Sequence, residues 1–137
     1  MYLPDTNIVS ALVRGHAGVH ARAEVAKRRQ EAIVFSPLVE YEIERGLLRT
    51  GASTLRGRVE AVVSQFVDVP FTRSVWLKAA QLWAYSRDQA HPVPDSDILV
   101  AAQAIDLGAI AVTDNERHFR LFEAFGLQIE NWLKPIA

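Results

Sequence analysis

The sequence contains no cysteine, and its 137 residues carry a formal net charge of only −1. The lack of cysteine excludes disulfides, thiolate zinc sites and cysteine nucleophiles, and it is compatible with a reducing cytoplasm, where we expect the protein to reside. The small net charge argues against an extended, charge-driven grip on nucleic acid, although a local basic patch is still allowed. No charge-free run is long enough to span a bilayer, and no basic, apolar leader precedes Asp5, so we expect neither a membrane segment nor a secretory signal.

The remaining composition is typical of one globular domain, which we expect to span 1–137. Short apolar runs with strand character alternate along the chain with amphipathic segments of helical period. We expect strands at 1–3, 32–35, 66–70, 109–113 and 127–129, and helices at 8–13, 19–30, 37–49, 54–65, 72–89, 97–107 and 116–125. This alternation predicts an α/β fold with a short, mostly parallel sheet flanked by helices, whose strands all end at one rim.

Polar residues follow the first expected strand at once, as Asp5, Thr6 and Asn7. In an open parallel sheet, ligands bind beyond the carboxyl ends of the strands, so Asp5 is a candidate site residue. The alternative is that Asp5 or Thr6 only caps the following helix, which such residues often do. These two interpretations can be separated by whether other acids reach the same rim.

The helix expected at 37–49 contains the acids Glu40, Glu42 and Glu44. Helical spacing places Glu40 and Glu42 on opposite borders of its apolar face and Glu44 further out. The geometry therefore favours Glu42 over Glu40 only slightly.

Two more acidic segments lie later in the chain. The helix that ends at Gly108 is apolar almost all the way round, with Asp97 in its first turn and Asp95 or Ser96 expected as its cap. Asp114 directly follows the expected strand 109–113 and should reach the same rim as Asp5. Either acid of the 95–97 segment could simply complement the helix dipole, but a pair of them is less easily explained in that way.

Acids gathered at one rim require a cation, because close carboxylates repel one another. Oxygen ligands suit Mg²⁺ or Mn²⁺, and the histidines show no zinc-ligand spacing. A divalent ion with bound waters is the usual apparatus for phosphate chemistry. The residues alone therefore indicate metal-dependent hydrolysis of a phosphodiester or phosphomonoester.

With these residues in hand, the chain resembles PIN-domain ribonucleases, and among them the VapC-type toxins of VapBC toxin-antitoxin pairs. Residues 3–10 (LPDTNIVS) resemble the family opening LDTNIxS, and residues 42–46 (EIERG) resemble its E-L-x-x-G segment. Residues 92–101 resemble P-I-x-x-x-D-x-L-I-A, residues 112–119 resemble VTxNxxHF, and residues 129–132 resemble the closing V-x-x-W type. Each segment is weak alone, but their order and spacing together are specific.

The resemblance implies a three-layer PIN-like fold and a Mg²⁺- or Mn²⁺-dependent endoribonuclease. It selects Glu42 over Glu40 and implies an acidic site of Asp5, Glu42 and Asp97, with Asp114 as a more variable fourth member. Asp5 and Asp97 would bind the metal, and Glu42 and Asp114 would do so directly or through water. It also implies a homodimer and silencing by a cognate VapB-like antitoxin.

Further residues are expected to support the acids or the substrate. Groups that would orient acids or bound waters are Thr6, Asn7, Asp95, Thr113 and Asn115. Basic side chains that could contact RNA are Arg14, Arg45 and Arg49.

Two features depart from the family pattern. Pro94 stands where many relatives carry Gly, and Asp95 adds an acid two residues before Asp97, which leaves open which of the two faces the metal.

Two other hypotheses compete with the nuclease. A haloacid-dehalogenase-like phosphatase also places an Asp after its first strand, but it requires a second Asp where this chain has Asn7. A catalytically decayed PIN interaction module is the other alternative, against which the retained acids argue.

Overall fold

The structure, a computed structural model, describes residues 1–135. Its strands are β1 (Tyr2–Pro4), β2 (Val34–Phe35), β3 (Val67–Asp68), β4 (Ile110–Val112) and β5 (Gln128–Glu130). Its helices are α1 (Thr6–Val13), α2 (Ala17–Arg28), α3 (Pro37–Thr50), α4 (Ser53–Val63), α5 (Arg73–Asp88), α6 (Asp95–Leu107), α7 (Glu116–Arg120) and the 3₁₀ helix η1 (Leu121–Phe125). Each expected element is present, although the segment 116–125 is divided between α7 and η1.

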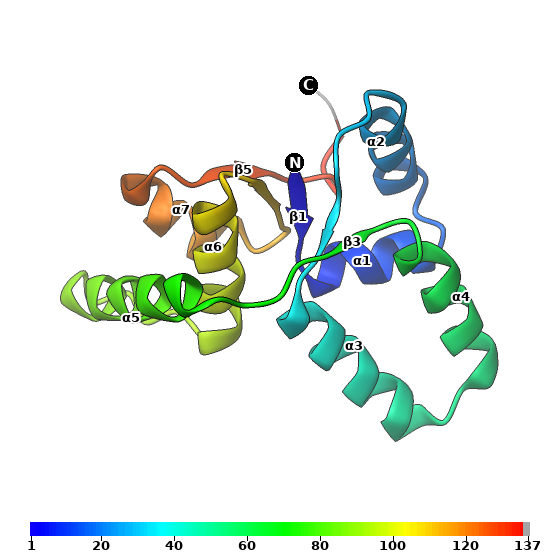
Figure 1. The fold of residues 1–137 in the computed structure, drawn as a ribbon, viewed down its shortest axis with the longest axis horizontal. Helices are drawn as coiled ribbons and strands as arrows, with labels where there is room; N and C mark the ends of the chain where they lie inside the picture. Colours follow the sequence, from blue (N-terminus) through cyan, green and yellow to red (C-terminus); the bar gives the residue numbers. More distant parts are fainter. Residues whose placement is uncertain (136–137) are drawn as a thin grey trace.

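The strands pair in parallel, as the alternation of short strands and helices predicted. One sheet has the order β1-β4-β5, and β2 pairs with β3 in a second, two-stranded sheet. A parallel bridge between Tyr2 and Ile33 joins β1 to the segment that leads into β2. In Figure 1, α5, α6 and α7 lie to the left of β1 and α1, α2 and α4 to its right, so β1 runs through the middle of the molecule. The predicted α/β fold is therefore confirmed.

Helix α6 is the central helix of the larger core. It packs against α5, α3, α7, β1 and β4, and its buried residues follow one another almost without interruption from Ile98 to Ala104. Gln103 is fully buried among them and donates its Nε2 proton to the carbonyl oxygen of Val69 at 2.9 Å, which links α6 to the chain after β3. The apolar circumference of this segment predicted its burial correctly.

The predicted cap of α6 is wrong by one residue. The carbonyl oxygen of Pro94 accepts the first helical hydrogen bond, from the backbone N–H of Ile98 at 3.1 Å, so Pro94 occupies the cap and Asp95 is the first helical residue. Gly108 ends the helix with φ +65°, a conformation that glycine adopts without steric cost. Asp97 consequently lies in the first turn, as predicted.

None of the helices within residues 1–135 is both long enough and apolar enough to cross a bilayer.

Two neighbouring leucines of α3 test how this fold is stabilised. Leu47 is 6% exposed, whereas Leu48 is 70% exposed on the same helix. We expect Leu47→Ala to lower the free energy of unfolding by about 2 kcal/mol or more, because it removes buried methyl groups. Leu48→Ala should change it by less than about 0.5 kcal/mol. Urea unfolding of both variants measures the difference, and equal losses would contradict the described packing of α3.

Candidate active site

Asp5 is held where β1 ends and α1 begins. Its backbone N–H donates to the carbonyl oxygen of Val112 at 2.9 Å, which continues the pairing of β1 with β4. Its Oδ1 accepts a hydrogen bond from the backbone N–H of Ile8 at 3.2 Å, so Asp5 is the N-cap of α1. Its Oδ2 accepts a hydrogen bond from the hydroxyl of Thr113, the residue that follows β4. Asp5 therefore does cap its helix, but the Thr113 contact also ties it to the end of the neighbouring strand.

Burial changes the acidity of this carboxyl. Asp5 is only 7% exposed, and desolvation raises its pKa to about 6. Hydrogen bonds from the Thr113 hydroxyl and from the backbone N–H groups of Ile8 and Asn7 lower the pKa, whereas the negative charge of Asp97 raises it further. The charge of Asp97 therefore opposes ionisation of Asp5, in addition to the larger effect of burial.

A chain of hydrogen bonds connects Asp5 to Asp97. The hydroxyl of Thr113, which donates to Asp5, accepts a hydrogen bond from the backbone N–H of Asn115 at 2.9 Å. The side-chain amide of Asn115 then donates to Oδ2 of Asp97 at 2.7 Å. Thr113 and Asn115 therefore link the two acids through hydrogen bonds, and the orienting role expected of them stays a prediction.

Glu42 joins this group through Thr6. The hydroxyl of Thr6, next to Asp5 in the chain, donates to Oε1 of Glu42 at 2.6 Å. Arg45 lies one turn further along α3, and its guanidinium is 3.4 Å from Oε2 of Glu42. Glu40 is exposed on the outer side of α3, and Glu44 forms a bidentate ion pair with Arg56. Of the three acids on α3, the hydrogen bonds therefore link Glu42 to the Asp5 segment.

The structure separates Asp95 from Asp97. Asp95 is exposed and lines a shallow pocket with Trp76 and Trp83 of α5, whereas Asp97 is bound by Asn115 of the 113–115 segment. Neighbours on a helix two residues apart point in different directions, which explains the divergence. The geometry favours Asp97 as the member of the acidic group.

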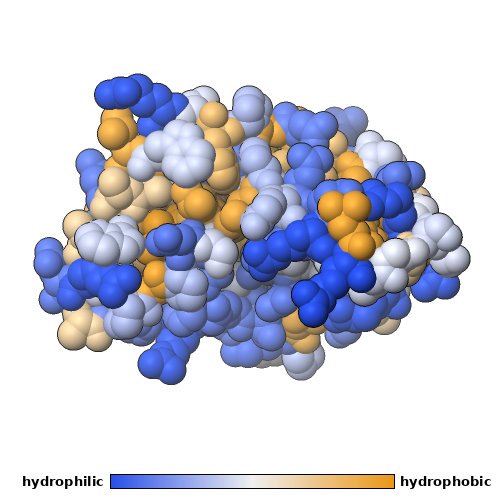
Figure 2. Space-filling view, turned by 90° about the horizontal axis from the view of Figure 1, so that it is seen from below, coloured by the Kyte–Doolittle hydropathy of each residue, from blue (hydrophilic) through white to orange (hydrophobic). Residues whose placement is uncertain are grey.

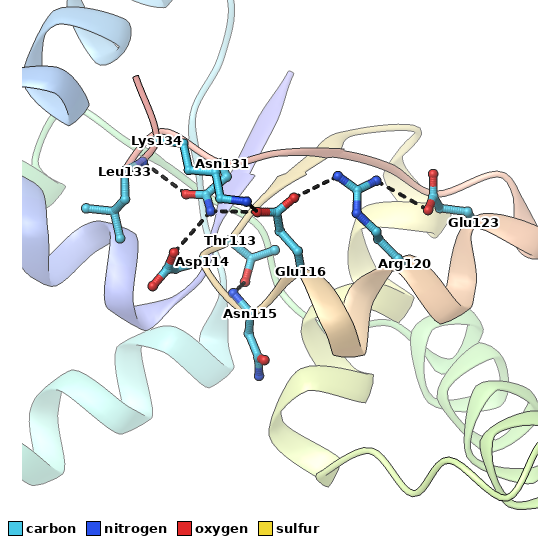
Figure 3. A network of polar contacts seen from close by, with 9 residues as sticks. All are labelled: Thr113, Asp114, Asn115, Glu116, Arg120, Glu123, Asn131, Leu133 and Lys134. Carbon is cyan, nitrogen blue, oxygen red and sulfur yellow. Dashed lines mark hydrogen bonds and ion pairs between the residues drawn. The ribbon is translucent and has the colours of Figure 1, made fainter. Parts of the chain in front are cut away.

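Asp114 belongs to a second polar network (Figure 3). The side-chain amide of Asn131 donates to Asp114 and to Glu116, at 3.0 Å in each case. Glu116 also pairs with Arg120 at 2.7 Å and with Lys134 at 2.5 Å, and these donors lower its pKa to about 2. In Figure 3, Asp114 and Asn115 point in different directions. The described hydrogen bonds therefore do not join Asp114 to Asp5 or Asp97, and its place in the site stays a prediction.

A groove of about 370 Å³ opens beside Glu42, between α1, α3 and α4. Its lining includes Thr6, Arg14, Glu42 and Gly46, above an apolar floor. Figure 2, which views the molecule from below, shows a hollow on the side of α3 and α4 that strongly hydrophilic side chains flank. Of the acidic group, Glu42 lines this groove.

The donor set fits a small divalent cation. No group of three or more His, Asp or Glu side chains within residues 1–135 is spaced as a complete set of metal ligands. Mg²⁺, however, commonly binds only one or two carboxylates and keeps its waters, with substrate phosphates completing the shell. Asp5 and Asp97 supply the carboxylate oxygens that such an ion prefers, and a cation near Asp5 would offset the burial and the nearby charge of Asp97 that together raise its pKa.

One polar contact of the acids was missed by sequence reasoning. Nδ1 of His118 lies 2.7 Å from Oδ2 of Asp97. The available signal was the spacing of Asn115 and His118, three residues apart and so on one face of a short helix. Zinc-ligand spacing among the histidines does not indicate a contact with a carboxylate that lies 21 residues away in the chain.

Fold and site together define an α/β protein that gathers acids at the carboxyl edge of a parallel sheet. A model of the PIN-domain family matches residues 2–123. The chain therefore belongs to the PIN-domain family.

Individual relatives agree with this assignment. The chain is 30% identical over 122 residues to Ribonuclease VapC19 of Mycobacterium tuberculosis, which covers 89% of this chain and 94% of the relative. It is 23% identical over 137 residues to Ribonuclease VapC1 of Haemophilus influenzae, and the alignment covers 98% of this chain and 99% of the relative. Its fold is similar to a chain in the crystal structure of VapBC2 from Rickettsia felis bound to a promoter DNA fragment, with a TM-score of 0.84, 21% identity, and 96% and 98% covered.

The raised pKa of Asp5 predicts a pH-dependent effect of Asp5→Asn on stability. Because the folded pKa of about 6 lies above that of the unfolded chain, near 4, the wild type loses stability as pH rises through this interval. In metal-free buffer at pH 8, Asp5→Asn should raise the free energy of unfolding by about 1–2 kcal/mol. Near pH 3, below both pKa values, the gain should vanish, since wild-type Asp5 is then largely protonated in both states. Urea unfolding at both pH values measures this difference, and a loss of stability at pH 8 would contradict it.

Proposed function

We propose that this protein is a metal-dependent endoribonuclease that cleaves RNA phosphodiester bonds, the toxin of a type II toxin-antitoxin pair. The observation that carries the proposal is the hydrogen-bonded chain from Asp5 through Thr113 and Asn115 to Asp97. Curated relatives named as VapC ribonucleases, over nearly their whole length, support the same activity.

Asp5 and Asp97 would hold a Mg²⁺ or Mn²⁺ ion, with Glu42 and Asp114 reaching it directly or through water. When bound, the ion supplies a water of lowered pKa and neutralises charge on the phosphoryl oxygens. The hard oxygen donors and the mutual repulsion of the two Asp residues support this choice of cofactor.

Hydrogen bonds from the chain's own residues would orient the carboxylates of the site. Thr113 and the backbone N–H of Ile8 fix both oxygens of Asp5, and Asn115 fixes Oδ2 of Asp97. Thr6 fixes one oxygen of Glu42. Acids held in this way need little reorganisation when substrate arrives, which is the main source of catalysis in phosphate-transfer sites.

Basic side chains near the groove would hold the RNA backbone. Arg14 lines the groove, and Arg45 and Arg49 are exposed on α3. Each could neutralise a phosphate on either side of the scissile bond. Arg45 also pairs with Glu42, so an incoming phosphate would compete with that carboxylate for it.

The competing functions have less support. In the phosphatase hypothesis, Asn7 would replace an essential Asp, and its side chain is exposed, while only its backbone N–H contacts Asp5. If the protein were a catalytically decayed module, its function would not require a buried Asp5 with a raised pKa and hydrogen bonds to Thr113 and Ile8. A chromogenic phosphomonoester and metal-dependent thermal melting distinguish these two from the nuclease.

The two acids at the start of α6 provide a matched test of the nuclease. We expect Asp97→Asn to reduce Mg²⁺-dependent RNA cleavage at least 100-fold, since it removes a metal-binding charge, and Asp5→Asn to abolish it. Asp95→Asn, two residues away on the exposed side, should keep activity within about threefold of the wild type. Cleavage of a fluorescent RNA measures all three variants. Equal activity of Asp97→Asn and the wild type would refute the catalytic assignment.

The partner proposals follow from the family. We infer that the protein acts in the cytoplasm as a homodimer and is silenced by a VapB-like antitoxin, which the VapBC complexes among similar solved structures support.

The reading frame next to its gene should encode a small DNA-binding protein. On co-expression, that protein should co-purify with this chain and suppress RNA cleavage. Light scattering should give twice 15.3 kDa for the chain alone. Full cleavage in the presence of the neighbouring gene product would contradict the toxin assignment.

A further inference from the structure

His118 contacts the acidic group, and the residues discussed so far give it no role. It lies on α7, and its Nδ1 is 2.7 Å from Oδ2 of Asp97 and 2.7 Å from the side-chain nitrogen of Asn115. Its side chain is only 25% exposed. Three polar atoms from three side chains thus meet at one point, and which of them donate depends on the tautomer of His118.

An ionised carboxylate oxygen can only accept hydrogen bonds. An unprotonated Nδ1 could accept the second amide proton of Asn115, but it would place its lone pair against Oδ2 of Asp97, so the contact with Asp97 favours the tautomer in which Nδ1 carries the proton. The amide of Asn115 donates to the same oxygen. In that tautomer Oδ2 of Asp97 accepts from two donors, while no side chain or backbone group within residues 1–135 donates to its Oδ1.

A second histidine holds the ring of His118 in place. The rings of His91 and His118 are 6.2 Å apart between centroids and meet edge to face at 79°. His91 precedes α6, the helix that carries Asp97, and its Nε2 is buried without a hydrogen-bond partner in the described chain. The next residue in the chain, Phe119, is fully buried and anchors α7. The imidazole is thus held between Asp97 and His91.

We propose that His118 is a positioning residue that, with Asn115, fixes Oδ2 of Asp97 and leaves Oδ1 as the oxygen that binds the divalent cation. This inference rests on the proposed nuclease function. His118 itself touches neither the cation nor the substrate. Two donors on one oxygen restrict rotation of the carboxylate, and loss of such supporting donors in metal sites typically costs 10- to 100-fold in metal affinity.

Three variants separate donation from packing. His118→Leu keeps a similar volume but removes the donor, whereas His118→Asn places an amide nitrogen near the position of Nδ1. His20→Leu is the control, because His20 is exposed on α2 and lines a different pocket. Circular dichroism and thermal melting establish that each variant is folded.

Calorimetric titration with Mn²⁺ alone provides the main measurement. We expect the Kd of His118→Leu to rise 10- to 100-fold and that of His118→Asn to stay within about fivefold of the wild type, with His20→Leu unchanged. RNA cleavage by His118→Leu should recover largely at saturating Mn²⁺, since the defect lies in metal binding. Proton–nitrogen correlation spectra of the wild type at pH 8 should show a proton on Nδ1 of His118.

The possible outcomes are distinct. Wild-type Mn²⁺ affinity in His118→Leu, an equal loss in His118→Asn, or an unprotonated Nδ1 overturns the role of His118 and leaves the nuclease proposal intact. A wild-type protein that binds no Mn²⁺ and cleaves no RNA overturns both, and the wild-type titration alone reveals that case.

Discussion

The parallel pairing of β1 with β4 is the constraint on which the site depends. Leu3 pairs with Ala111 and Pro4 with Val112, so Asp5 and Thr113 leave the sheet side by side. A slip of one residue would turn the side chains of β1 to the opposite faces and move Asp5 away from Thr113. Because Leu3 and Ala111 are fully buried in the core, such a slip would also expose apolar surface. The core therefore sets the register, and the register places Asp5 beside Thr113.

The site keeps a charge where water is scarce. Burial of Asp5 disfavours its ionised form, and the nearby Asp97 disfavours it further, while hydrogen bonds from Thr113 and Ile8 offset only part of this cost. A fold selected for stability alone would not keep this arrangement. A bound cation would offset the remaining cost. Without metal, the buried charge of Asp5 lowers the stability of the fold, although the same charge is what would bind the metal. The same opposition is common at active sites.

Patterns in the sequence predicted the features of the fold that depend on interactions between residues near one another in the chain. The apolar circumference of α6, the strand before Asp5 and the glycine that ends α6 could all be identified from sequence, since each reflects burial or backbone freedom over a few residues. Patterns could not separate Glu42 from Glu40, or Asp97 from Asp95, because these choices depend on which side chain meets Thr6 or Asn115 across the fold. The family resemblance selected Glu42 and pointed to Asp97, and the hydrogen bonds of the structure favour the same two. The contact of His118 with Asp97 is of the same long-range kind, and so is the attachment of Asp114 to Asn131.

The central claim is that Asp5 and Asp97 together hold one divalent cation. Anomalous diffraction at the manganese edge, from crystals of the wild-type protein grown with Mn²⁺, tests it most directly. The account predicts a peak about 2.1 Å from a carboxylate oxygen of each residue, with Oδ1 rather than Oδ2 as the ligand from Asp97. A fully occupied manganese ion elsewhere, with Asp5 and Asp97 bound only to protein and water, would contradict it.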